Sequence, residues 1–343
     1  MDADKGRAPN IRDVAREAGV SYQTVSRVLN DSTAIRPGTR DRVLHAIGEL
    51  GYRPNPAARA LVTSRSKTIG VLSSQSALYG PTTSIQAIEV AARVAGYRLS
   101  VTSITTSEYD SIRAGLDFLL GQSIDALVIL APQVGVFEAI RELSISVPFV
   151  TLEATALDPV RSLSVDQIRG ARIAVRHLID LGHTEIVHIA GPSDWIEAQA
   201  RYEGFSEELR DAGLRPRAQI VGDWTAEFGY RAGLELLRAR DFTAVFCGND
   251  QTALGFMHAC RDAGVRVPDD VSVVGFDDTP ESAHFAPGLT TVRQNFAEIG
   301  RRAVALLLAE LEGSSELDHA PIPPELVVRA STAPPPAAPA PRP

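Results

Sequence analysis

The sequence predicts an α/β protein in two parts, a small all-helical head that contains a helix-turn-helix and a larger body built on doubly wound parallel sheets. Two observations carry this prediction. In residues 9–55 apolar side chains recur at helical spacing around a glycine turn, and from residue 67 onward apolar strands alternate with amphipathic helices. The body of about 265 residues is large for one such sheet, so two lobes are expected.

The charge of the chain is unevenly distributed. The 343 residues carry a formal net charge of −8, which argues against a uniformly basic nucleic-acid coat and against a polycationic membrane binder. Residues 1–65, however, hold 11 Lys and Arg against 7 Asp and Glu, a balance of +4 that leaves −12 for the rest. A positive head on an acidic body predicts that the head meets an anionic polymer.

Membrane and disulfide signals are weak. No apolar run approaches the roughly 18 residues of a membrane span, and the N-terminus lacks the apolar stretch of a signal peptide, so a cytoplasmic protein is expected. Cys247 and Cys260 stand in apolar stretches and are expected to be buried thiols, because two cysteines are too few for a disulfide framework.

The head is predicted to hold three helices. Residues 11–18 have apolar side chains at helical spacing, and Gly19 is suited to the left-handed conformation that ends a helix. Ser21 is a natural N-cap for a second helix over residues 22–29, which gives a helix-turn-helix. A third helix, over residues 39–50, is expected to turn four apolar side chains to the same core: Val43, Leu44, Ile47 and Leu50.

The second helix is expected to leave four side chains outside: Tyr22, Gln23, Ser26 and Arg27. Gln can bond an adenine edge in two places and Arg a guanine edge likewise, each good pair giving roughly 1–3 kcal/mol of discrimination. Arg36, Arg40 and Arg42 are placed to meet phosphates. This pattern favours DNA binding, and the alternative is a solvated polar face on an ordinary three-helix bundle.

The motifs IRDVA at residues 11–15 and VSYQTVSRVLN at residues 20–30 resemble the DNA-binding head of the LacI/GalR family of bacterial repressors, and of its lactose-sensing members in particular. The resemblance implies that Tyr22, Gln23 and Arg27 read bases. It implies mainly backbone contacts for a second set: Ser21, Thr24, Ser26, Asn30 and Thr39.

A hinge is predicted after the head. Prolines at 54 and 56 break the third helix, but Pro56 also suits a first helical turn capped by Asn55, and residues 57–62 would continue it. So short a helix is not stable alone, so it is expected to fold only against DNA or a partner copy. The resemblance implies that paired hinge helices of a dimer enter the minor groove with Asn55 and Ala58 beside it and Leu61 wedged between base pairs. The alternative is a tether with Leu61 packed on the body.

The body is predicted to contain strands at residues 68–72, 126–130, 148–152, 185–190, 244–247 and 271–276. Helices between them include residues 84–95, 167–181, 200–212, 228–238 and 252–263. Such alternation implies parallel sheets covered by helices on both faces, with ligands bound beyond the C-terminal ends of the strands. In a two-lobed body that place is the cleft between the lobes.

Polar residues follow the strands at this edge: Ser73, Ser74, Glu153, Asn249, Asp250, Asp277 and Asp278. With the nearby Arg201 they can grip vicinal hydroxyls, and Trp224 offers a face for a sugar ring, which together predict a polyol site. The alternatives are a helix cap at Asn249 and a turn at Asp277.

The motifs IAGP at 189–192, RYEGF at 201–205, NDQTALG at 249–255 and GFDD at 275–278 resemble the periplasmic-binding-protein-like sensor domain of the LacI/GalR family. The resemblance implies effector contacts from Ser74, Arg201, Asn249 and Asp277, and apolar walls from Trp224 and Phe296. The chain departs from the lactose-sensing members at four positions. Glu153 is a longer side chain where they have a carboxylate, Leu130 stands for an asparagine, Glu197 for a small hydroxyl residue and Arg93 for an acid. The implied effector is a β-galactoside-like or other disaccharide-derived sugar.

These features predict a repressor of carbohydrate-utilisation genes, with no metal or cofactor, that leaves a pseudo-palindromic operator when a sugar fills the cleft. One alternative is a corepressor-dependent regulator that senses a purine or other small metabolite, and another is a sugar-binding protein without a regulatory role. An enzyme is disfavoured, since the chain lacks a G-x-G-x-x-G fingerprint, a P-loop and a G-x-S-x-G elbow.

The expected domains are the helix-turn-helix head at 9–55, a hinge helix and linker at 56–66, and a ligand-binding core at 67–332. In the core, an N-lobe of about 67–165 and 295–321 and a C-lobe of about 166–294 and 322–332 are expected. Residues 333–343 contain only Pro, Ala and Arg and are expected to form a disordered tail. A Leu-rich coiled coil is absent there, so a homodimer rather than a tetramer is expected.

Overall fold

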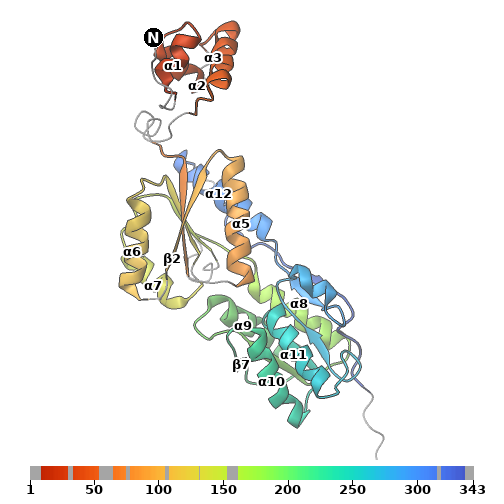
Figure 1. Ribbon diagram of the computed structural model, residues 1–343. Helices are drawn as coiled ribbons and strands as arrows, with labels where there is room; N and C mark the ends of the chain where they lie inside the picture. The colour runs from red at the N-terminus through yellow and green to blue at the C-terminus, as the bar shows by residue number, and fades with distance from the viewer. Residues whose placement is uncertain are drawn as a thin grey trace, which may run out of the picture. The chain divides into compact units, whose positions relative to one another are not determined.

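The computed structural model describes residues 9–29, 34–53, 65–74, 78–104, 108–130, 132–152, 161–314 and 318–336. The chain divides into two compact units, Met1–Lys67 and Thr68–Pro343 (Figure 1). None of the helices in the described parts combines the length and the apolar character that a membrane crossing requires.

The first unit holds three helices, α1 (Ile11–Glu17), α2 (Tyr22–Leu29) and α3 (Pro37–Leu50). Helix α1 begins with a capping box, in which the Asn10 side chain accepts from the Asp13 backbone N–H and the Asp13 carboxylate accepts from the Asn10 N–H. Gly19 follows with φ +63°, and the Ser21 hydroxyl accepts the Thr24 N–H at 3.2 Å to cap α2. The turn and the cap thus match the roles that the sequence predicts for Gly19 and Ser21.

Apolar side chains from all three helices form the core of this unit, with Val14, Val25 and Val43 fully buried. One expectation here is wrong: Leu44 is 51% exposed, and Ala46 takes the inner position at 2%. The reason is helical periodicity, because positions 43, 46, 47 and 50 lie three or four residues apart and residue 44 falls outside that stripe.

The second unit begins with a five-stranded parallel sheet that defines the N-terminal lobe, in the order β2-β1-β3-β4-β5. Its strands are β1 (Thr68–Ser74), β2 (Arg98–Ile104), β3 (Ala126–Leu130), β4 (Phe149–Leu152) and β5 (Ser162–Leu163). The helices of this lobe are α5 (Tyr79–Val94), α6 (Tyr109–Leu120), α7 (Val134–Glu142) and α12 (Phe296–Leu311).

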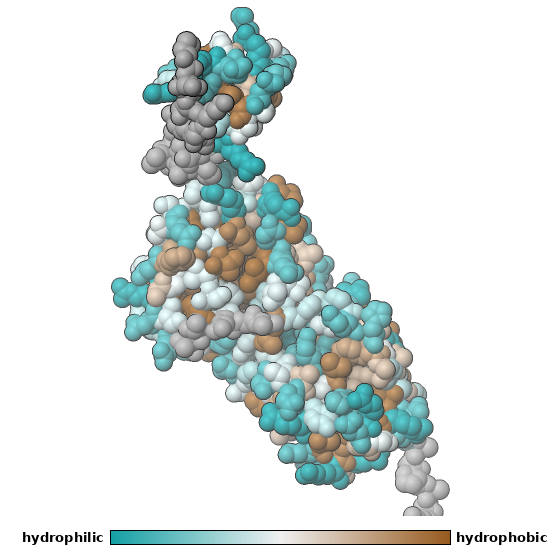
Figure 2. Space-filling view, viewed as in Figure 1, coloured by the Kyte–Doolittle hydropathy of each residue, from teal (hydrophilic) through white to brown (hydrophobic). Residues whose placement is uncertain are grey.

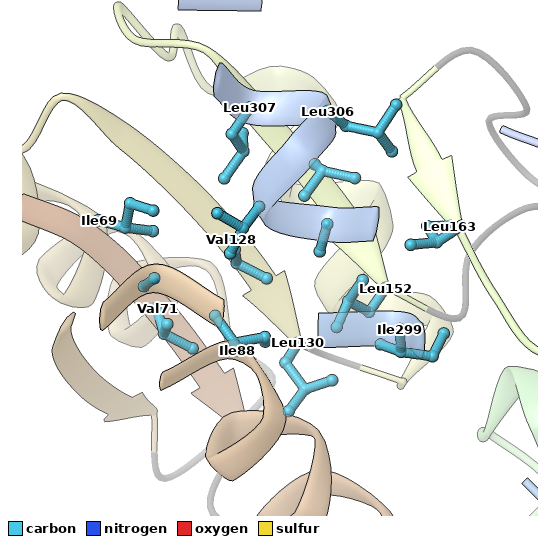
Figure 3. Close-up of a cluster of buried hydrophobic side chains, with 14 of the residues drawn as sticks. Ile69, Val71, Ile88, Val128, Leu130, Leu152, Leu163, Ile299, Leu306 and Leu307 are labelled. Carbon is cyan, nitrogen blue, oxygen red and sulfur yellow. The ribbon is translucent and has the colours of Figure 1, made fainter. Parts of the chain in front are cut away.

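Both faces of this sheet are covered, because successive side chains of a buried strand point to opposite faces. Val128 and Leu130 join the cluster under α5 and α12, which Figure 3 shows with Ile88 and Ile299 from those helices. Leu127 and Ile129 join a second cluster under α6 and α7. The sequence of β3 is therefore a continuous apolar run.

A second parallel sheet, in the order β7-β6-β8-β9, defines the C-terminal lobe. Its strands are β6 (Ile186–Ala190), β7 (Ile220–Val221), β8 (Ala244–Cys247) and β9 (Ser272–Val274). One face is covered by α10 (Ala226–Ala239) and α11 (Asp250–Asp262), the other by α8 (Gln167–Asp180) and α9 (Ile196–Asp211). Both cysteines are buried free thiols.

The chain passes between the lobes along three segments. The first leads from β5 to α8, where Val165 pairs with Ile322 of the third. The second leads from β10 (Thr291–Arg293) to α12, and the third leads from α12 back to β11 (Glu325–Val327), which pairs antiparallel with β10. A short 3₁₀ helix, η1 (Pro280–His284), lies between β9 and β10.

The sequence interpretation missed strands whose residues are mixed or few. Strand β2 lies at a sheet edge with three of its seven side chains exposed, so it lacks the apolar run of a central strand. Strands β5 and β7 are two residues long, and only their pairing with β4 and β6 defines them.

The expected start of the disordered tail at residue 333 is too early. The backbone of Ala333 is fixed on the C-terminal lobe, because its N–H donates to the Ser272 hydroxyl at 3.0 Å and its carbonyl accepts from the same hydroxyl at 2.9 Å. The ring of His183 also contacts that carbonyl, at 2.9 Å. Residues 337–343 lie outside the described part of the chain.

Helices α8 and α9 approach closely at Gly204, where an added Cβ would stand 2.3 Å from the Ile168 carbonyl oxygen. Gly204→Ala is therefore expected to lower the free energy of unfolding by about 1–3 kcal/mol. The matched control is Gly135→Ala on α7, which meets nothing within 4 Å and should be neutral or stabilising by up to about 1 kcal/mol. Urea unfolding followed by circular dichroism measures both, and equal midpoints would contradict this packing.

Candidate functional site

Helix α2 presents the predicted base-reading side chains on one surface. Tyr22, Gln23 and Arg27 are exposed, Tyr22 at 54%, while Val25 and Val28 face the core. Thr24 and Ser26 are half-buried, and the hydroxyls of Ser21 and Thr24 form a hydrogen bond of 2.9 Å. Thr39 lies half-buried in the first turn of α3.

The predicted contacts at Asn30, Asn55, Ala58 and Leu61 lie outside the described residues, as does Glu153 of the predicted effector site. The hinge therefore stays a prediction.

A pocket of about 50 Å³ lies between the two lobes, at the C-terminal ends of the strands. The N-terminal lobe contributes Leu78, Tyr79, Gly80, Pro81, Ser84, Leu130, Pro132, Leu152 and Phe296. The C-terminal lobe and the segment that leads from it to α12 contribute Gln167, Trp195, Glu197, Arg201, Trp224, Asn249, Asp277 and Gln294. Of the predicted effector residues, the pocket brings together Arg201, Trp224, Asn249, Asp277 and Phe296.

Four buried polar side chains form a ring at the floor of this pocket. The Arg201 guanidinium donates to the side-chain oxygen of Gln167 at 2.9 Å, and the side-chain amide of Gln167 donates to the side-chain oxygen of Gln294 at 2.8 Å. The Gln294 amide donates to the Asp277 carboxylate at 2.6 Å, and that carboxylate lies 3.8 Å from Arg201. Each of the four is at most 7% exposed, so the ring satisfies groups that are costly to bury alone.

Arg201 is further fixed by its surroundings. Its guanidinium donates to the Gly248 carbonyl and lies over the Phe276 ring at 3.9 Å and the Trp224 ring at 5.3 Å. A planar, fixed and charged donor of this kind suits the oxygen atoms of a polar ligand.

Asp277 lies in an unusual backbone stretch. Its φ is 111° and that of Asp278 is 55°, conformations that L-residues rarely adopt. Asp278 is held by Arg293 at 2.7 Å and by Arg329, which fix this turn against the C-terminal part of the chain. Burial raises the pKa of Asp277 to about 6, although Arg201 and Gln294 favour its charged form. The predicted turn and the predicted ligand role thus coincide at one position.

Asn249 also has two roles. Its side-chain oxygen accepts the Thr252 N–H at 2.9 Å and caps α11, and its amide donates to the Trp224 carbonyl at 3.0 Å. The helix cap that the sequence left as an alternative is present, on a residue that lines the pocket. Its neighbour Asp250 is fully buried behind it, and burial followed by the nearby Asp277 raises the pKa of Asp250 to about 7.

The wall of the pocket is aromatic. Trp224 has φ 68° and lies against Gly191, where an added Cβ would stand 2.0 Å from the indole. The Trp224 Nε1 is buried and has no hydrogen-bond acceptor among the described residues. Opposite, Phe296 and Tyr79 meet edge to face with ring centroids 5.8 Å apart.

Ser74 is the one predicted effector residue in the described chain that does not line the pocket. It ends β1 as a buried side chain, 6% exposed, and its hydroxyl has no partner among the described residues. Conversely, the sequence interpretation missed Tyr79, Gln167, Trp195 and Gln294. The two glutamines are 127 positions apart, so no local pattern joins them.

The geometry defines a class of protein: a helix-turn-helix head joined to a two-lobed body with a polar pocket between the lobes. Residues 10–55 match the family model described as bacterial regulatory proteins, lacI family, and residues 175–332 match a periplasmic binding protein-like domain.

The chain is 36% identical to the lactose operon repressor of Escherichia coli (strain K12) over 324 residues, 93% of this chain and 89% of the relative. It is 33% identical to the HTH-type transcriptional repressor PurR of Haemophilus influenzae (strain PittEE), over 94% of this chain and 98% of the relative. The crystal structure of the Lac repressor dimer bound to operator and the anti-inducer ONPF superposes with a TM-score of 0.86 at 34% identity, covering 95% of this chain and 100% of that one. A transcriptional regulator CelR–cellobiose complex is similar with a TM-score of 0.70 at 31% identity, covering 94% and 99%.

The chain belongs to the LacI family and is a DNA-binding transcriptional repressor of that family.

Behind the pocket, His188 is stacked 4.7 Å from Phe246 and 5.2 Å from Phe205, and its Nδ1–H donates to the Phe246 carbonyl. Burial, more than the nearby Arg201, lowers its pKa to about 4. Because the unfolded chain binds this proton first, His188 should reduce the free energy of unfolding by about 3 kcal/mol as the pH falls from about 7.5 to about 4.

The measurement compares wild type with His188→Phe by urea unfolding across this pH range. As the pH falls, the unfolding free energy of the wild type should decrease relative to that of His188→Phe. Parallel curves would show that His188 does not titrate in this way.

Proposed function

We propose that this repressor binds a pseudo-palindromic operator as a homodimer and releases it when a neutral sugar enters the pocket between the lobes, in keeping with a role in carbohydrate-utilisation genes. The observation that carries the proposal is the Arg201–Asp277 pair, buried beside Trp224 at the floor of that pocket. A guanidinium and a carboxylate grip adjacent hydroxyls, and an indole face packs on the apolar side of a sugar ring. The buried Trp224 Nε1 is a further donor that a ligand oxygen would satisfy.

The coupling to DNA rests on the connections of the ring. Gln167 opens α8 directly after the first segment between the lobes, and Gln294 lies on the second. A ligand that moves Arg201 or Asp277 therefore pulls on the segments about which the lobes turn. We infer that this lobe movement changes the geometry of the two heads in the dimer.

The experiment is a titration of a labelled operator, selected by the protein from random duplexes, with sugars and separately with purine bases. Weaker operator binding with a sugar supports the proposal. Tighter operator binding with a purine would instead identify a corepressor-dependent regulator like the PurR relatives, and no change with any ligand would remove the allosteric claim.

For base reading by α2, Gln23→Ala and Arg27→Ala should each weaken operator binding by about fivefold to 150-fold and leave binding to random DNA nearly unchanged. Arg36→Ala is the control, because a phosphate contact should weaken both kinds of DNA alike. Fluorescence anisotropy at fixed salt measures both. Equal losses on the two DNAs from Gln23→Ala would contradict base reading.

Effector binding should depend on pH through Asp277, whose pKa is raised to about 6 by burial. The charged form accepts ligand hydroxyls, so the sugar affinity should fall by about tenfold between about pH 7.5 and about pH 5. Asp277→Asn should bind weakly and without this pH dependence. Calorimetry checks both, and an equal pH dependence in the variant would assign it to another group.

The homodimer proposal rests on an apolar groove between α5 and α12 of about 620 Å³, where Val90 is 50% and Val94 86% exposed. Figure 2 shows hydrophobic residues gathered on the visible face of the N-terminal lobe. So exposed an apolar edge favours a second copy as its occupant. The similar Lac repressor structure is of a dimer, which supports a dimer here.

Val94→Asp should therefore give monomers in sedimentation velocity, because it places a charge in the contact. Phe118→Asp on α6, where Phe118 is 61% exposed on the other side of the sheet, should stay dimeric. Two dimeric variants, or a wild-type monomer, would contradict this interface.

A further inference from the structure

The start of α9 contributes two more side chains to the pocket, beside the ring of Arg201 and Asp277. Trp195 is half-buried at the N-cap of α9, and Glu197 lies in its first turn. Both line the pocket. Glu197 stands where the sequence resemblance implies a small hydroxyl residue, so this part of the pocket carries a longer and acidic side chain.

The backbone around Trp195 is hydrogen-bonded to the N-terminal lobe. Trp195 forms an antiparallel bridge with Gln133 of the N-terminal lobe, in which the Ile196 N–H donates to the Pro132 carbonyl at 2.9 Å and the Val134 N–H donates to the Asp194 carbonyl at 3.0 Å. Ile196 also packs on Phe137 of α7. The backbone under Trp195 is thus ordered before a ligand arrives, which lowers the entropy cost of using its side chain in binding.

This group lies next to the ring, one helical turn away along α9. Glu197 precedes Arg201 by one helical turn on the same face of α9, a rise of about 6 Å. The Trp195 indole meets the Trp224 indole edge to face, with centroids 5.7 Å apart and planes at 66°. Two indole faces at an angle offer stacking surfaces for two sugar rings rather than one.

We propose that Trp195 and Glu197 form a second subsite that takes the second ring of a neutral disaccharide, while Arg201 and Asp277 hold the first. The inference rests on the proposed sugar response and names the class of sugar. Leu130 and Pro132 close the subsite from the N-terminal lobe.

The charge of the pocket selects neutral rings. Among the lining residues in the described part of the chain, Arg201 is the one cation, and it lies beside Asp277, whereas Glu197 adds a second acid. A sugar phosphate or uronate in the second subsite would place its negative charge beside the Glu197 carboxylate. Hydroxyls, which a carboxylate accepts in pairs, fit this position.

The test is calorimetry of the full-length protein with lactose, cellobiose and maltose, and with glucose and galactose as single rings. At least one disaccharide should bind about tenfold or more tighter than its component rings. Trp195→Ala should remove about 10- to 100-fold of that disaccharide affinity and leave single-ring affinity within about twofold. Trp195→Phe should restore most of it, and Glu197→Gln should lower it less than Trp195→Ala.

Trp224→Ala is the matched control, because it removes the wall of the first subsite and should weaken both sizes of sugar. Single rings that bind as tightly as disaccharides, or equal losses for both in Trp195→Ala, would overturn the second subsite and leave the sugar response standing. If no sugar of either size binds the wild type, both proposals fall.

Discussion

Burial of the Arg201–Asp277 pair is the constraint on which the body of this repressor depends. Two opposite charges removed from water cost more than their attraction returns unless their remaining donors and acceptors are also satisfied. Here Gln167, Gln294 and the Gly248 carbonyl provide those partners, so that the charges remain in a buried floor. Because Gln167 and Gln294 lie on two different connections between the lobes, the pair is satisfied only when the C-terminal lobe and both connections are in place.

The same constraint explains why the site is built from rare backbone conformations. Trp224, Asp277 and Asp278 all have positive φ, and each is held there by its neighbours rather than by its own preference. Gly191 leaves space for the Trp224 ring, and Arg293 and Arg329 hold Asp278. These contacts fix the positions of Trp224 and Asp277 in the pocket in the absence of a ligand.

Local sequence was sufficient to predict features that depend on a single helix or strand. The cap at Ser21, the exposed face of Tyr22, Gln23 and Arg27, and the strands of the two sheet centres follow from periodicity and turn chemistry. Motifs in the body also predicted a shared site for Arg201 and Asp277, and both side chains line one pocket.

Partners distant in sequence were out of reach of such reasoning. Gln167 and Gln294 meet only because the chain crosses between the lobes, and Trp195 reaches the pocket only because its backbone pairs with Gln133. Leu44 is apolar, but its angular position on α3 lies outside the inner stripe, and β2 is an edge strand that lacks the apolar run of a central one. For the glutamines, Trp195 and β2 the deciding information was tertiary, whereas for Leu44 it was the period of the helix itself.

We propose that the pocket and the helix-turn-helix head are energetically coupled, and coupling between two binding sites is reciprocal. The most direct measurement is the sugar dissociation constant of the dimer alone and of the dimer saturated with operator. We expect operator to weaken sugar binding by the same factor by which sugar weakens operator binding, and we expect Asp277→Asn to weaken sugar binding both with and without operator. Sugar binding of equal strength with and without operator would contradict it.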